Sequence, residues 1–180
     1  FRSPSSASGE TPDSLLLDGQ QRLTSLYQVL VRKQVVATLT PRRQRVRRWF
    51  YLDIEKCLDE AGDRDEAVVI LPEGRRVTSE FGRVIDLDLS TRELEFENMM
   101  FPLTSVLDYA DWQTAFVMQY SATDDFQARF QRLNEFHERV IKNFTEYLVP
   151  QIELSAYTSK EAVCVVFEKV NTGGKALDAF

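Results

Sequence analysis

Cysteine and histidine are scarce in this sequence of 180 residues, which holds two cysteines and one histidine. Cys57 and Cys164 lie far apart, and neither has a second cysteine or a histidine at metal-ligand spacing. The sequence therefore argues against a structural zinc site and against a disulfide framework. A chain with so few cysteines is typical of a reducing compartment, so we expect a cytoplasmic protein.

Long apolar runs are missing too. The longest, Ala162–Phe167, is far shorter than the roughly 20 residues that a membrane-spanning helix needs. Residues 1–6 lack the apolar core of a signal peptide, so no membrane partner is expected. The sequence has no initiator methionine, and residues 175–180 read as the opening of another helix. We therefore expect an internal piece of a longer protein, incomplete at both ends.

Basic residues are outnumbered in this chain. The 22 lysines and arginines face 28 aspartates and glutamates, which gives a net charge of −6 and a pI near 5.0. This balance excludes a globally basic nucleic-acid coat protein. With 43% hydrophobic residues the chain is able to bury one sizeable core, and its length fits a single domain over residues 1–180.

Hydrophobic periodicity predicts an α+β domain with a small mixed sheet and a long helix in its C-terminal half. The expected strands are residues 15–17, 49–53 and 67–71. The expected helices are residues 22–33, residues 123–149 with Thr123 as N-cap and Pro150 as the stop, and a last helix that follows the N-cap Ser159. Residues 1–13 and 34–48 are predicted to be loops.

The densest polar group of the sequence is Asp18-Gly19-Gln20-Gln21-Arg22, between the first predicted strand and the first predicted helix. The first turn of a helix attracts anions, and Gly19 lets the backbone approach a ligand closely. Arg22 adds a guanidinium that can grip phosphate, Asp18 can hold Mg²⁺ or orient water, and both glutamines can donate and accept hydrogen bonds. Alternatively, Asp18 is an N-cap, Gly19 a turn residue and the glutamines a solvated face.

Two segments resemble one protein family. Residues 17–26, LDGQQRLTSL, closely resemble the DGQQR signature of the N-terminal domain of GmrSD-type restriction endonucleases. Residues 167–177, FEKVNTGGKAL, are similar to the later signature of that family, in which an aromatic residue, an asparagine, glycine and leucine follow one another at the end of a helix. The two segments occur in the right order and bracket almost the whole chain.

This resemblance implies a ParB/sulfiredoxin-like fold that binds and hydrolyses nucleoside triphosphate with a divalent metal such as Mg²⁺. Carried over to this sequence, the catalytic residues are Asp18, Gln20, Gln21 and Arg22, with Asp18 as the metal ligand. Gly19 and Arg22 bind the nucleotide, and Asn171, Gly173 and Gly174 form a second wall of its site. From its residue type alone, Asn171 caps the end of a helix or contacts a ligand. Phosphoryl transfer supports these roles, because it needs positioning and charge stabilisation more than a covalent nucleophile.

The resemblance also implies a place in bacterial defence against phage, where family members sense modified DNA and couple nucleotide turnover to a separate nuclease domain. An aromatic-Gln-Arg element of the family lies upstream of where this sequence begins. A single histidine cannot build a His-Asn-His nuclease centre, and no Glu-x-Lys triplet occurs. We therefore expect DNA cleavage to be carried out by another part of the parent protein.

Residues 31–50 contain seven basic residues and no acidic one. Five arginines stand close together in this stretch beside Trp49 and Phe50: Arg42, Arg43, Arg45, Arg47 and Arg48. Arginines interleaved with aromatic residues suit phosphate contact and base stacking, while a solvated connection is the alternative. The same stretch supports a second hypothesis for the whole chain, a non-catalytic module that keeps the fold and binds DNA or a protein partner.

Overall fold

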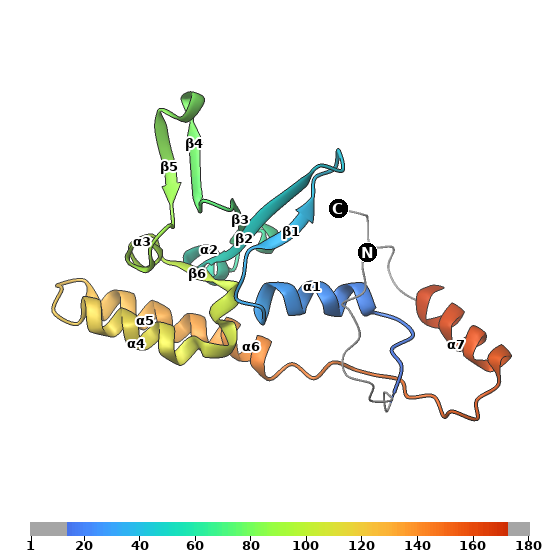
Figure 1. Ribbon diagram of the computed structural model, residues 1–180. Helices are drawn as coiled ribbons and strands as arrows, with labels where there is room; N and C mark the ends of the chain where they lie inside the picture. Colours follow the sequence, from blue (N-terminus) through green and yellow to red (C-terminus); the bar gives the residue numbers. More distant parts are fainter. Residues whose placement is uncertain (1–13, 173–180) are drawn as a thin grey trace. The chain divides into compact units, whose positions relative to one another are not determined.

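A computed structural model describes residues 14–172 of the chain (Figure 1). The chain divides into two compact units. The larger unit is Arg22–Tyr147, and the smaller unit includes the described residues 14–21 and 148–172. The expected combination of strands and helices is confirmed.

The larger unit is built on a sheet in which β2 pairs with three other strands. The strands are β1 (Val36–Leu39), β2 (Arg45–Asp53), β3 (Val68–Pro72) and β6 (Met100–Pro102). Every pairing in it is antiparallel, so the prediction of a mixed sheet was wrong. The strands predicted at 49–53 and 67–71 are confirmed as the second half of β2 and as β3.

Residues 36–48 form a β-hairpin, so the prediction of a loop over residues 34–48 was wrong from residue 36 onward. Leu39 of β1 is paired with Arg45 of β2, and the turn between them is closed by the Thr40 N–H, which donates to the Gln44 carbonyl at 3.0 Å. The Thr40 hydroxyl accepts the Gln44 N–H at 3.1 Å. Alternating β-branched residues such as Val36 favour the extended backbone on either side of this turn.

A second hairpin stands apart from the sheet in Figure 1 and consists of β4 (Arg76–Ser79) and β5 (Val84–Asp88). The short 3-10 helix η2 (Glu80–Gly82) connects its strands. Phe81 lies in this connection with a φ of 59° and a fully exposed ring. A bulky residue with a left-handed backbone is strained, because its Cβ crowds the following carbonyl oxygen.

The larger unit also contains several helices. They are α1 (Gln20–Leu30, which enters this unit at Arg22), α2 (Ile54–Leu58), η1 (Arg64–Ala67), α3 (Arg92–Glu97), η3 (Leu103–Asp108), α4 (Tyr109–Tyr120), α5 (Phe126–Phe136), the π-helical turn η4 (His137–Ile141) and α6 (Lys142–Thr145). The predicted long helix is thus confirmed in its central part, but Thr123 is not its N-cap. The Thr123 hydroxyl instead donates to the Tyr120 carbonyl at 2.8 Å, at the end of α4.

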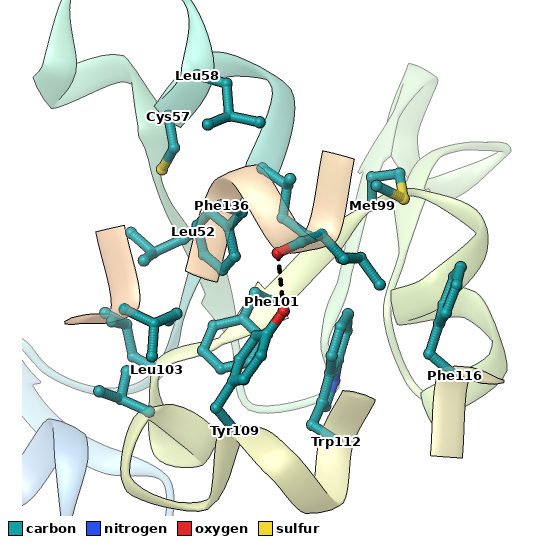
Figure 2. Close-up of a cluster of buried hydrophobic side chains, with 14 of the residues drawn as sticks. Leu52, Cys57, Leu58, Met99, Phe101, Leu103, Tyr109, Trp112, Phe116 and Phe136 are labelled. Carbon is teal, nitrogen blue, oxygen red and sulfur yellow. Dashed lines mark hydrogen bonds between the residues drawn. The ribbon is translucent and has the colours of Figure 1, made fainter. Parts of the chain in front are cut away.

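Aromatic side chains fill the core of the larger unit (Figure 2). Phe101 of β6 contacts Trp112 edge to face, with ring centroids 5.0 Å apart, and Phe136 in the same way at 5.4 Å. Such edge-to-face pairs add stability beyond the burial of apolar area. The Tyr109 hydroxyl, also in this cluster, donates to the Leu133 carbonyl at 2.9 Å, so the buried phenol has a partner.

The smaller unit contains α7 (Lys160–Thr172). The Ser159 hydroxyl accepts the Ala162 N–H at 3.2 Å, which confirms Ser159 as the N-cap of this helix. The prediction of a strand at 15–17 was wrong, because these residues pair with no strand in the described part of the chain and the three leucines are exposed.

Candidate functional site

The DGQQR segment forms the entry to α1. Gly19 has a φ of 80°, and Gln20, Gln21 and Arg22 are the first three residues of the helix. The helix therefore begins two residues earlier than the periodicity predicted, and Asp18 lies just before its first turn. A left-handed φ favours glycine at position 19, because an added Cβ would meet the backbone there. The first turn of the helix thus follows directly on a glycine with a left-handed backbone.

This turn exposes its polar side chains to solvent. Asp18, Gln20, Gln21 and Arg22 are all exposed, while Gly19 is half-buried. The helix has 11 residues, long enough for its aligned peptide dipoles to create a positive potential at this end. A guanidinium, two amides and a carboxylate thus lie within five consecutive residues at a helix N-terminus, an arrangement suited to a phosphate ligand.

The side chains of the turn also determine which kind of divalent metal site it can form. Within residues 14–172, no three histidine, cysteine, aspartate or glutamate side chains converge into a ready metal site. Mg²⁺ commonly binds through one or two carboxylates and takes its other ligands from phosphate and water. Asp18 alone therefore fits a metal that arrives together with a nucleotide, and it does not fit a metal held by protein side chains only.

The hydrophobic stripe of α1 is only partly buried. Val29 and Leu30 pack against the core of the larger unit, as the predicted amphipathic helix requires. Leu23, Leu26 and Tyr27, which belong to the same stripe, remain exposed. The sequence pattern thus correctly predicted the helix, but the N-terminal half of its apolar face covers none of the buried cluster.

The predicted second wall of the site is described only at Asn171. This residue lies in the last turn of α7, and Gly173 and Gly174 lie outside the described residues. The contribution of these three residues to a nucleotide site therefore stays a prediction.

The arginine-rich stretch lies on the β1–β2 hairpin. Arg42 and Arg43 are in its turn, and Arg43 has a φ of 60°. Arg45, Arg47 and Arg48 are on β2, opposite β1. Their positions on a regular strand place them at defined spacings, which a flexible connection would not do.

A scan against models of protein families matches residues 4–180 to the GmrSD restriction endonuclease, N-terminal domain. The chain belongs to this family. The resemblance drawn from its two signature segments is thereby confirmed. No curated protein and no solved structure gave a significant match. Membership of the GmrSD family places the chain in a restriction protein, and it implies interaction with DNA and a nuclease domain in the parent protein.

Over residues 14–172, none of the helices has the length and apolar character needed to cross a membrane.

One buried polar cluster of this GmrSD domain was not predicted from the sequence. Glu95 of α3 is buried, and its Oε1 accepts the Tyr51 hydroxyl at 3.1 Å and lies 3.6 Å from Arg75 Nη1. The Arg75 guanidinium also lies over the Trp49 ring, 4.3 Å from its centroid. Burial raises the pKa of Glu95, and the Tyr51 hydrogen bond and Arg75 oppose this rise.

The Glu95 cluster joins strand β2 to the base of the β4–β5 hairpin, since Arg75 immediately precedes β4. Its residues come from distant parts of the sequence: Tyr51 and Glu95 are 44 positions apart, and Arg75 lies between them. Glu95 occurs in the acidic segment Arg92–Glu97, whose three glutamates are residues of a type that is mostly exposed. No local signal distinguishes Glu95 from its exposed neighbours Glu93 and Glu97.

Proposed function

We propose that the turn at residues 18–22 binds a nucleoside triphosphate together with Mg²⁺, and that the domain hydrolyses this nucleotide. In the parent protein this activity would serve a cytoplasmic restriction system directed at modified phage DNA. The observation that carries the proposal is the left-handed Gly19 directly before the first helical turn, in a chain of the GmrSD family. That backbone shape allows a phosphate to approach the helix N-terminus without a side chain in its way.

Each residue of the turn has a distinct proposed task. Arg22 would grip the phosphate oxygens through two parallel N–H bonds, and it would stabilise negative charge that develops as the terminal phosphate leaves. Gln20 and Gln21 would hold the attacking water or a phosphate oxygen, since an amide both donates and accepts. Asp18 would orient that water or bind the metal, and Mg²⁺, when bound, would neutralise charge on the phosphate oxygens.

Hydrolysis at this turn needs no covalent intermediate. A water molecule would attack the terminal phosphorus, the bond from that phosphorus to the bridging oxygen would break, and nucleoside diphosphate and inorganic phosphate would leave. The proton lost by the water would pass to phosphate or to Asp18. We infer in addition that the domain is of the ParB/sulfiredoxin-like type, with Asn171, Gly173 and Gly174 as the second wall of the nucleotide site.

Calorimetric titration of the full-length protein with a slowly hydrolysed nucleoside triphosphate analogue and Mg²⁺ tests this proposal. Saturable binding is expected for the wild type and should be lost in Arg22→Ala. Arg83→Ala is the matched control, because Arg83 is also exposed but lies on the β4–β5 hairpin. It should bind as the wild type does.

A second variant tests the turn itself. Gly19→Ala forces a side chain into a backbone with a φ of 80°, which costs on the order of 1–2 kcal/mol when it is kept. We expect weaker nucleotide binding with an unchanged unfolding transition of the larger unit, whose core lies elsewhere. A folded full-length protein that binds no nucleotide would refute the proposed function and favour the non-catalytic interaction module.

A further inference from the structure

The β1–β2 hairpin is a two-stranded arm. Strand β3 pairs with β2 only from Arg48 onward, and β6 pairs only with residues 51–53. In the described part of the chain, Arg45 to Arg47 therefore have β1 as their sole neighbouring strand. Figure 1 shows this hairpin extending beyond the ends of the other strands of the sheet. We call residues 36–48 the arginine ribbon.

The arginine ribbon concentrates positive charge on an otherwise acidic chain. Arg42, Arg43, Arg45 and Arg47 are exposed. Within residues 14–172, Arg47 is the one ribbon arginine with a carboxylate in ion-pair distance, 2.7 Å from Glu73. The whole chain has a net charge of −6, yet it contributes few partners to this arm. Like charges held close together repel one another, and an anionic ligand bound to the ribbon would relieve this repulsion.

Spacing and orientation on the ribbon suit an extended polyanion. Alternate residues of a strand point to the same face about 7 Å apart, so Arg45 and Arg47 share one face of β2. Arg42 and Arg43 add two guanidinium groups at the tip of the arm. A guanidinium binds phosphate through paired N–H donors, and a two-stranded antiparallel ribbon is narrow enough to enter the major groove of duplex DNA.

The aromatic residues beside the arginines are not available for base stacking. The Trp49 ring is covered by the Arg75 guanidinium at 4.3 Å, and its Nε1 donates to the Glu73 carbonyl at 3.1 Å. Phe50 packs against the main core. Single-stranded nucleic acids are bound largely through exposed aromatic rings on which bases stack. The ribbon offers guanidinium groups without such rings, which favours a duplex.

We propose that the arginine ribbon is a duplex-DNA contact of this domain, in which Arg42, Arg43 and Arg45 bind backbone phosphates irrespective of base sequence. This inference rests on the family membership and on the ribbon, and it does not depend on the nucleotide site. The contact would add affinity and orientation, while recognition of a DNA modification would come from other groups.

The test uses Arg42→Gln/Arg43→Gln in the full-length protein. Binding to a fluorescent 20-base-pair duplex is followed by anisotropy from about 50 to 200 mM salt, with EDTA present to prevent cleavage. Each phosphate contact contributes about 0.9 to the slope of log K against log salt, so two lost contacts lower it by about 1.8. Over that salt range, the affinity of the wild type should thus fall about twelvefold more than that of the variant.

Arg64→Gln/Arg83→Gln is the matched control, since it removes the same charge from exposed positions away from the ribbon. It should keep the slope of the wild type. An unchanged slope in the ribbon variant would overturn the proposal, and so would an equal loss in the control, which would indicate a net-charge effect. Tighter wild-type binding to a single strand of the same length would overturn the assignment to duplex DNA. Nucleotide titration of the same variant keeps this test separate from that of the turn at residues 18–22.

Discussion

Replacement of Tyr51 by phenylalanine removes one oxygen atom from a ring that is 1% exposed. That oxygen donates to Glu95 Oε1 at 3.1 Å, and Glu95 itself is 4% exposed. The variant leaves a buried carboxylate without its hydroxyl donor, although Arg75 stays 3.6 Å away. A hydrogen bond to a charged group contributes about 1.5–3 kcal/mol, and we expect the free energy of unfolding to fall by roughly 2 kcal/mol or more.

Tyr109→Phe is the matched control for this change. The Tyr109 hydroxyl is also buried, but it donates to the uncharged Leu133 carbonyl at 2.9 Å. A hydrogen bond to a neutral acceptor contributes about 0.5–1.5 kcal/mol. Because both variants delete the same atom from a buried ring, the cost of the small cavity largely cancels between them. The excess cost of Tyr51→Phe then reports the charge on Glu95.

This excess should depend on pH. Burial raises the pKa of Glu95, and loss of the Tyr51 hydrogen bond raises it further. The excess requires an ionised carboxylate, so it should be largest at high pH and should shrink as the pH falls and Glu95 binds a proton. Urea denaturation of both variants at pH 7 and at pH 4, followed by tryptophan fluorescence, measures these free energies. Equal costs at pH 7, or an excess that is the same at both values, would refute the assignment of a buried charge.

Three further changes test other parts of the structure. In Glu95→Gln the pH dependence of stability caused by this carboxyl should disappear. Because the pKa of Glu95 is raised in the folded state, its contribution to stability is full below the ordinary pKa of glutamate and is lost as the pH rises through the folded-state pKa. Urea denaturation at a series of pH values shows whether the variant loses this dependence. Leu133→Ala deletes a fully buried side chain and should cost about 2–5 kcal/mol in denaturant unfolding, whereas Leu148→Ala, at a position 88% exposed, should change it by less than about 0.5 kcal/mol. Phe81→Gly relieves the backbone strain of a residue with a φ of 59°, and it removes a side chain that is fully exposed. Calorimetry should therefore show a melting temperature no lower than that of the wild type. A clear fall would mean that Phe81 stabilises the fold.

Sequence patterns predict helix ends and strands correctly where neighbouring residues determine the structure. The serine before α7 accepts the helix N–H that its sequence position predicted, and the hydrophobic run at 49–53 is a strand. Residues 34–48 were misread because a run of arginines outweighed the β-branched residues among them. Their extended form depends on hydrogen bonds between β1 and β2, a pairing that charge patterns do not report.

Non-local packing explains why the sequence did not predict the π-helical turn and the burial of Glu95. The 3.6-residue periodicity predicts one regular helix over residues 123–149, but the buried positions of this stretch are Leu133, Phe136 and Ile141. The π-helical turn at His137–Ile141 shifts the phase of the stripe by one residue. Similarly, Glu95 is buried only because Tyr51 and Arg75 reach it from distant segments. At the candidate site, the sequence predicted the turn and the helix, which begins two residues earlier than expected, while the roles of its residues stay proposals.

The wide turn at His137–Ile141 has a bearing on insertions and deletions in this helix. A π turn closes over five residues where an α turn closes over four, so it accommodates one residue more than regular winding requires. Removal of one residue between Phe136 and Ile141 would convert the wide turn into an ordinary one and leave the helix on both sides in place. The same deletion inside α5 would rotate all following side chains by about 100° and carry Leu133 or Phe136 away from the core. We therefore expect this helix to tolerate a one-residue deletion at the π-helical turn, which lies between the buried side chains of Phe136 and Ile141.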